Sequence, residues 1–162
     1  MASAVSTPPT TSRPRPRKGP HIALWSAQVV LAAVFAMAGL LKTTMPIPEL
    51  AKQLSFVPVV GAGVTRFIGV AELTGAVGLL LPALTRIRPI LTPLAATGLL
   101  LVMVLAAGFH LLHAEPQYLP ITAVLGGMAA FIAWGRFRWA PIAPRTGTFE
   151  TNVNIGPTTP TA

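Results

Sequence analysis

One carboxylate lies inside a long apolar run and is the group in this chain best placed to do chemistry. From Phe67 to Leu81, the neighbours of Glu72 are apolar residues, glycines and one threonine. A charged side chain in hydrocarbon costs on the order of 3 kcal/mol, so it normally faces a protein interior and has a partner. We therefore expect Glu72 to point into a bundle of helices, where it carries a proton or binds a polar group.

Two further polar side chains are expected at a similar depth. Lys42 closes the first apolar run of the chain, and His110 lies near the end of the third. Antiparallel helices would bring both residues to the half of the bundle that holds Glu72. The lysine stem is long enough to reach across this distance while it packs against apolar surface. We predict an intramembrane polar pocket formed by Lys42, Glu72 and His110.

Small residues follow the same helix face as Glu72. A rotation of 100° per residue places Gly69 and Gly75 close to the direction of the carboxylate. Small residues allow close helix contact or line a cavity, and they are of little use against lipid. Gly69 and Gly75 therefore join the predicted pocket. A second interpretation stays open, in which the polar pair only fixes the helix register.

Metal and thiol chemistry have little support in the sequence. His110 and His113 share one helix face, but two ligands are too few for a metal or haem site, and we predict none. Histidines that bond to water at a membrane interface are the simpler interpretation. The chain has no cysteine, which excludes thiolate nucleophiles, disulfide exchange and cysteine-ligated clusters within it.

The composition indicates that these residues are carried by membrane-spanning helices. The chain is 52% hydrophobic and 10% charged, against about 25% charged in soluble domains. A helix of about 20 apolar residues crosses the hydrocarbon core. We predict an all-α, four-helix transmembrane bundle. The predicted spans are residues 22–41, 64–82, 90–112 and 118–134, the second one stopped by Pro82.

Three regions follow from this layout. We expect a disordered basic tail over residues 1–20, a membrane domain over 21–140 and a disordered tail over 141–162. The stretch Ala36-Met37-Ala38 resembles a signal-peptidase site, so a cleaved signal peptide is an alternative for the first span. Three more spans follow it, which favours a retained helix.

The first loop carries its own helical pattern. Ile47, Leu50, Leu54 and Val57 recur at helical spacing between prolines. This pattern predicts a short amphipathic helix at the membrane surface. It is either a plain connector or a lid over a cavity.

The distribution of charge predicts the orientation. The loops between the first and second spans hold three of the 12 basic residues, Lys42, Lys52 and Arg66, and the others fall on the side of the termini. The positive-inside rule then places both termini in the cytoplasm of a multi-pass protein of the inner (plasma) membrane. The lipid bilayer is the expected partner. The chain lacks the stacking aromatics and basic groove of nucleic-acid binders, so we expect no nucleic-acid partner.

Three segments together resemble the DoxX-like family of small four-helix membrane proteins. Gly39-Leu40-Leu41-Lys42 is similar to the family's Gly-x-x-Lys ending of the first helix. Gly69-Val70-Ala71-Glu72-Leu73-Thr74-Gly75, followed by Pro82, is similar to its second-helix signature. Ala107-Gly108-Phe109-His110 is similar to the end of its third helix. The resemblance covers roughly residues 22–140 and leaves out both tails.

The resemblance implies the fold and the membrane location more firmly than the activity. Relatives act beside redox enzymes or as assembly factors, and the family's name comes from a relative of a thiosulfate:quinone oxidoreductase subunit. We expect an accessory or ligand-binding subunit, without catalytic activity of its own, whose pocket takes a quinone or lipid-like molecule. The alternatives are a membrane subunit of a quinone-linked oxidoreductase, an assembly factor that contacts a redox enzyme or other membrane protein, and a small transporter.

Overall fold

The chain folds into four long helices and three short helical pieces. The computed structural model describes residues 18–142, and the predicted tails lie almost wholly outside this range. Within it there is no β-strand, which confirms the all-α prediction. The elements in chain order are α1 (Lys18–Thr44), α2 (Ile47–Gln53), α3 (Val57–Thr85), α4 (Leu91–Leu112), the 3-10 turn η1 (Pro116–Tyr118), α5 (Leu119–Trp134) and the π-helical turn η2 (Gly135–Trp139).

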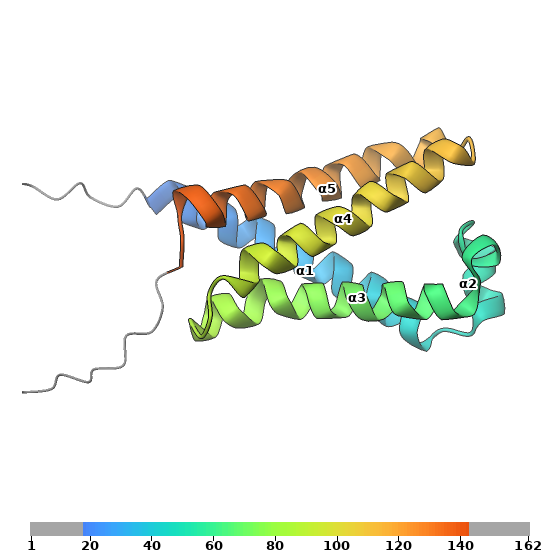
Figure 1. Ribbon diagram of the computed structural model, residues 1–162, viewed down its shortest axis with the longest axis horizontal. Coiled ribbons are helices and arrows are strands. Elements are labelled where there is room, and N and C mark those ends of the chain that lie inside the picture. The colour runs from blue at the N-terminus through green and yellow to red at the C-terminus, as the bar shows by residue number, and fades with distance from the viewer. Residues whose placement is uncertain (1–17, 143–162) are drawn as a thin grey trace, which may run out of the picture.

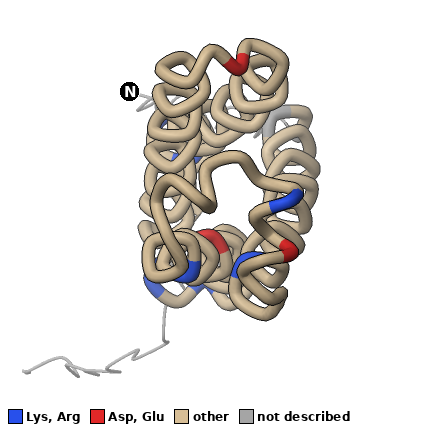
Figure 2. The backbone as a smooth tube through the Cα atoms, turned by 90° about the vertical axis from the view of Figure 1, so that its right-hand side faces the viewer, with Lys and Arg blue, Asp and Glu red and all other residues tan. Residues whose placement is uncertain are grey.

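The long helices run antiparallel around one axis (Figures 1 and 2). The start of α1, the α3–α4 turn and η2 lie together at one end, which we call the terminal end (Figure 1). The other end, which we call the α2 end, holds α2 and the α4–α5 connection. Four segments are long and apolar enough to cross a membrane: His21–Thr44, Val57–Thr85, Leu91–Leu112 and Pro116–Trp139. The chain is therefore a multi-pass membrane protein, as the sequence predicts.

The buried positions of α1 and α3 recur every three or four residues. This spacing is typical of helices that pack with a small left-handed crossing angle. Polar residues occupy several of these positions beside apolar ones. On α1 the buried residues include Leu24, Gln28, Leu31, Phe35, Gly39 and Lys42, and on α3 they include Thr65, Gly69, Glu72, Ala76, Leu79 and Ala83.

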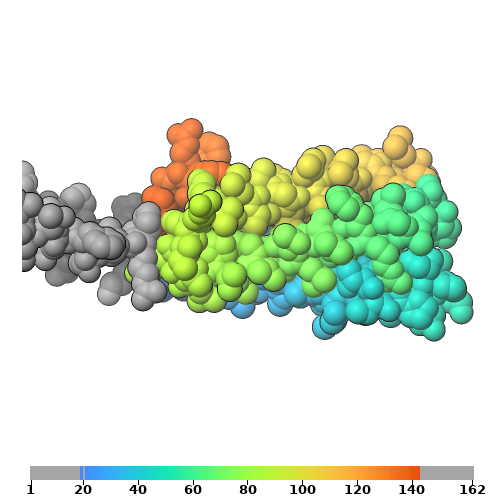
Figure 3. Space-filling model, turned by 60° about the horizontal axis from the view of Figure 1, so that its bottom comes forward, coloured from blue at the N-terminus to red at the C-terminus, as the bar shows by residue number. Residues whose placement is uncertain are grey.

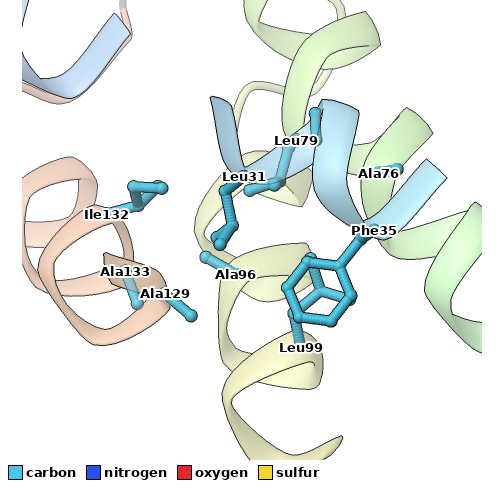
Figure 4. Close-up of a cluster of buried hydrophobic side chains, with 10 residues drawn as sticks. Leu31, Phe35, Ala76, Leu79, Ala96, Leu99, Ala129, Ile132 and Ala133 are labelled. Carbon is cyan, nitrogen blue, oxygen red and sulfur yellow. The ribbon is translucent and has the colours of Figure 1, made fainter. Parts of the chain in front are cut away.

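The apolar core lies towards the terminal end and draws on all four long helices (Figure 4). Large side chains of α1 and α3, such as Phe35 and Leu79, meet alanines of α4 and α5, such as Ala96 and Ala129. The alternation of large and small residues fills the space between closely packed helices. On α4 the fully buried residues all lie between Thr92 and Leu99, and beyond Leu99 none is fully buried. Helix α4 is thus packed more tightly at the terminal end than at the α2 end.

The end of α3 differs from the prediction. Pro82 does not stop the second span, because α3 continues to Thr85. A proline so close to the end removes a single backbone bond, and the last turn closes through the Arg86 N–H, which donates to the Pro82 carbonyl 3.0 Å away.

The short helix expected after Pro46 is present as α2, and its Leu50 side chain is buried. In the space-filling view, α2, the start of α3 and the α4–α5 connection meet at the right-hand end (Figure 3).

Candidate functional site

Lys42 and Glu72 form a buried ion pair between α1 and α3. The lysine Nζ donates to both carboxylate oxygens, at 2.9 Å to Oε1 and 2.8 Å to Oε2. The side chains are 11% and 3% exposed, respectively. Both residues belong to the buried stripes of their helices, so the pair sits within the bundle and away from lipid. The predicted partnership of these two residues is present in the structure.

The backbones of α1 and α3 come unusually close beside this pair. A Cβ atom added to Gly39 would lie 2.7 Å from the Gly69 carbonyl oxygen, and one added to Gly69 would lie 2.8 Å from the Lys42 Cβ. Only glycine fits at these distances, which are shorter than any normal carbon contact. The two glycines therefore set the helix separation at which the Lys42 ammonium reaches the Glu72 carboxylate.

Arg66 fixes the end of α1 from the other side. Its Nη1 donates to the carbonyl of Lys42 and its Nη2 to that of Met45. The last carbonyls of a helix have no partner within the helix, so these bonds satisfy two of them. A cation at this position also complements the negative end of the helix dipole. Arg66 thus holds the backbone of Lys42 in place without entering the ion pair.

Gly75, the other predicted glycine, faces a different helix. A Cβ there would meet Leu99 Cδ2 at 2.5 Å, so Gly75 makes room for α4. Gly69 lies against Lys42, whereas Gly75 lies about one turn beyond Glu72 along α3 and packs on α4, the third long helix. The carboxylate of Glu72 is thus flanked by two close helix contacts, one to α1 and one to α4.

His110 does not bond to the pair but belongs to a second polar cluster at the α2 end. Its Nδ1 lies 2.8 Å from Glu115 Oε2, and the same oxygen accepts a bond of 2.9 Å from the Ser55 hydroxyl. The ring of Phe109 stacks on His113 and meets Phe56 edge-on. This cluster ties the α2–α3 segment to the α4–α5 connection. The bonds from His110 and Ser55 lower the pKa of Glu115 below its usual value.

A third polar group was not predicted from the sequence. The Nε and Nη2 atoms of Arg136 both donate to Gln28 Oε1, with Nε at 2.7 Å, and Gln28 Nε2 donates to the Leu79 carbonyl at 2.8 Å. The guanidinium also lies 5.7 Å from the ring centre of Trp25. Arg136 is 3% exposed. The network joins α1, α3 and the end of α5 near the terminal end.

A hollow in the surface lies apart from all three polar groups. It is a groove of about 410 Å³ between α1 and α3, lined only by apolar residues from Val29 to Ala36 and from Ala76 to Leu84. None of the predicted site residues lines it. Among residues 18–142, no three histidine or acidic side chains lie close enough to hold a metal ion.

The comparison with protein families agrees with this arrangement. A sequence model of the DoxX-like family matches residues 26–132. The chain belongs to the DoxX-like family. No curated protein and no solved structure matches it.

In this DoxX-like protein, the first two of the three segments that carry the resemblance pack against each other. Gly39 packs on Gly69 and Lys42 pairs with Glu72, so the glycine and the charge of the first segment each meet those of the second. On each helix the glycine and the charged residue are three positions apart, so both lie on the face that meets the other helix. The sequence indicated that Lys42 and Glu72 could meet, and the structure adds the contact between Gly39 and Gly69.

Two other functional candidates of this DoxX-like protein carried weaker signals. Arg136 lies outside the matched residues and has the appearance of a topology signal, because it stands beside Arg138 in a basic cluster. Glu115 lies five residues after His110, beyond the end of the helix, so helical spacing gave no reason to join them. A glutamate in a short connection after a histidine was the only available hint.

Proposed function

We propose that this DoxX-like protein is a non-catalytic accessory protein of the membrane that binds a quinone or lipid-like molecule beside Lys42 and Glu72. The observation that carries the proposal is the hydrogen bonding of the lysine. An ammonium group has three N–H donors, and the two oxygens of Glu72 accept from two of them. Within residues 18–142 no other acceptor bonds to Nζ. A carbonyl or hydroxyl oxygen of a ligand headgroup would complete the set.

The energetics of the pair support a role beyond packing. A buried ion pair is often no more stabilising than well-packed apolar residues of similar volume. Within a membrane, an ionisable residue is therefore a functional candidate by default. Lys42 and Glu72 occupy core positions where leucine or alanine would satisfy the fold, so the presence of two charges there favours a use for them.

The packing around the pair is also consistent with a guest molecule. On α4, the residues from Leu100 to His110 are half-buried or exposed, whereas the segment from Thr92 to Leu99 holds the fully buried ones. Around α4, the α2 end of the bundle is thus the less tightly packed half. The apolar body of an amphiphilic ligand would pack against these half-buried residues of α4. Helix α2 would cover the ligand at that end of the bundle.

Native mass spectrometry of the protein in nanodiscs tests this proposal. Wild type, Glu72→Gln and Lys42→Met would be compared for retention of added ubiquinone, menaquinone and co-purified lipids. Glu49→Gln is the matched control, because Glu49 is exposed on α2. We expect one defined molecule that is retained by wild type and the control and lost from both pair variants. Equal retention by all four proteins, with folding intact by circular dichroism, would show that the pair serves structure alone.

The proposed location is the plasma membrane, with both termini in the cytoplasm. The basic residues of the α3–α4 turn and of η2 lie at the terminal end, and this asymmetry supports that orientation. Alkaline phosphatase and green fluorescent protein fusions at residue 142 provide the test. Fluorescence without phosphatase activity is expected, and the reverse pattern would invert the topology.

A further inference from the structure

We propose that the groove between α1 and α3 is a binding site for an anionic phospholipid, with one acyl chain in the groove and the phosphate against Arg86 and Arg88. This site is separate from the Lys42–Glu72 pair and does not depend on the function proposed for it. The proposal rests on the shape, depth and charge of the groove.

The groove has the chemistry and size of an acyl-chain site. Its lining is wholly apolar, and its volume of about 410 Å³ is within the range of small-molecule sites, about 300–1,000 Å³. Its side walls open outwards, because Val29 and Leu84 are exposed while Ala32 and Ala76 form the buried floor. The alanines keep the floor low, so a chain can lie between the larger side chains of the two helices.

The depth of the groove matches one leaflet of a bilayer. Along α3 it extends from Leu84 to Ala76, which is about 12 Å at the rise of an α-helix. Half of the hydrocarbon core is about 15 Å thick. Leu84 lies next to the last residue of α3, so the groove begins at the surface of the terminal end and stops near the membrane centre. A lipid of the leaflet at the terminal end would enter it with its headgroup outermost.

The charge at the mouth of the groove selects an anion. Arg86 and Arg88 follow the last turn of α3 directly, and both are exposed. The acidic residues among positions 18–142 are all elsewhere: Glu49 on α2, Glu72 in the buried pair and Glu115 bonded to His110. A phosphate at the mouth would thus meet two guanidinium groups and no carboxylate. Arginine suits phosphate because its planar group donates two parallel hydrogen bonds.

Both arginines of this turn have an uncommon backbone conformation. Arg86 and Arg88 have φ angles of 58° and 49°, in the left-handed region that favours glycine. A side chain in this conformation is sterically strained, and glycine or asparagine would be less strained. At Arg86 this conformation caps α3, and it places both arginines directly after the last turn of the helix.

Lipid titration followed by native mass spectrometry tests the proposal on the full chain. Delipidated protein in detergent would receive phosphatidylglycerol or phosphatidylcholine of the same acyl chains. We expect wild type to retain phosphatidylglycerol more strongly, by roughly fivefold for each arginine that contacts the phosphate. Arg86→Gln/Arg88→Gln should abolish the preference between the lipids, and Ala33→Phe, which fills the groove, should weaken both.

Matched controls separate a built site from general surface charge. Arg138→Gln removes a charge from the same end but away from the groove, and Ala123→Phe adds the same bulk on an exposed position of α5. Both should bind as wild type does. If Arg138→Gln reduces the preference as much as the Arg86 and Arg88 changes, the attraction is diffuse and the proposal is wrong. It is equally wrong if Ala33→Phe and Ala123→Phe behave alike.

Discussion

Gly39 and Gly69 face each other so closely that a Cβ atom on either would collide with the backbone or side chain of the other helix. Lys42 follows Gly39 by three residues and Glu72 follows Gly69 by three, so on these antiparallel helices the two charged residues flank the glycine contact and the lysine side chain spans it. Close approach and charge pairing are therefore parts of one arrangement. If the helices were moved apart, the lysine would no longer reach both carboxylate oxygens.

The first prediction concerns this glycine contact. Gly69→Ala should lower the free energy of unfolding by about 1–3 kcal/mol, because the new methyl group forces the packed helices to shift. Denaturant titration in detergent micelles, followed by circular dichroism, gives the measurement. Gly127→Ala is the control, since a Cβ at Gly127 meets nothing within 4 Å. The control should be neutral or slightly stabilising, because alanine is the better helix former. A neutral Gly69→Ala would mean that α1 and α3 are not in close contact.

The second prediction concerns the ion pair itself. Lys42→Met leaves the Glu72 carboxylate buried without a partner and should cost about 3–5 kcal/mol of stability. The double variant Lys42→Met/Glu72→Leu removes both charges and should regain most of that loss. The same titration measures both, with Lys52→Met as an exposed control. A double variant no more stable than the single one would argue that the charges do not compensate each other.

The third prediction concerns the network of Gln28 and Arg136. Gln28→Leu removes the acceptor of two guanidinium N–H groups and should cost about 1.5–3 kcal/mol, the usual range for hydrogen bonds to charged groups. Arg138→Gln should change stability little, because Arg138 is exposed. Thermal unfolding of the two variants beside wild type checks this. Equal unfolding temperatures for Gln28→Leu and wild type would contradict a structural role for the network.

The fourth prediction is a dependence on pH at the α2 end. The pKa of Glu115 is lowered by its bonds to His110 and Ser55, so its contribution to stability is present above the unfolded pKa of about 4.3. This contribution is lost as the pH falls through the lower, folded pKa. The groups that face Glu115 are His110 and Ser55, with His113 nearby. The protection factors for hydrogen exchange in α2 and η1, which are corrected for the intrinsic exchange rate at each pH, should therefore fall as the pH drops below the unfolded pKa.

Glu115→Gln provides the comparison for this effect. It should show faster exchange at neutral pH and lose the acid-dependent change at the α2 end. Glu49→Gln, on the exposed side of α2, should keep the wild-type dependence. An unchanged profile in Glu115→Gln would assign the effect to another group.

Much of this protein was determined by sequence alone. The membrane location, the number of long helices and the inward direction of Glu72 follow from apolar runs about 20 residues long and from the cost of a charge in hydrocarbon. The short helix α2 followed from the spacing of Leu50 and its neighbours. A pair of Lys42 with Glu72 was possible from depth and reach, because short connections leave few ways to arrange antiparallel helices.

Only the tertiary structure decided which polar residues meet. His110 shares the depth of Glu72, but depth does not fix the direction of a side chain around its helix axis, and the rotation of α4 gives His110 to Glu115 instead. Arg136 looked like a topology signal until the end of α5 brought it against Gln28, 108 positions earlier in the chain. Contacts between residues so far apart depend on helix rotation and separation, which close packing of glycines and leucines sets and which no local pattern records.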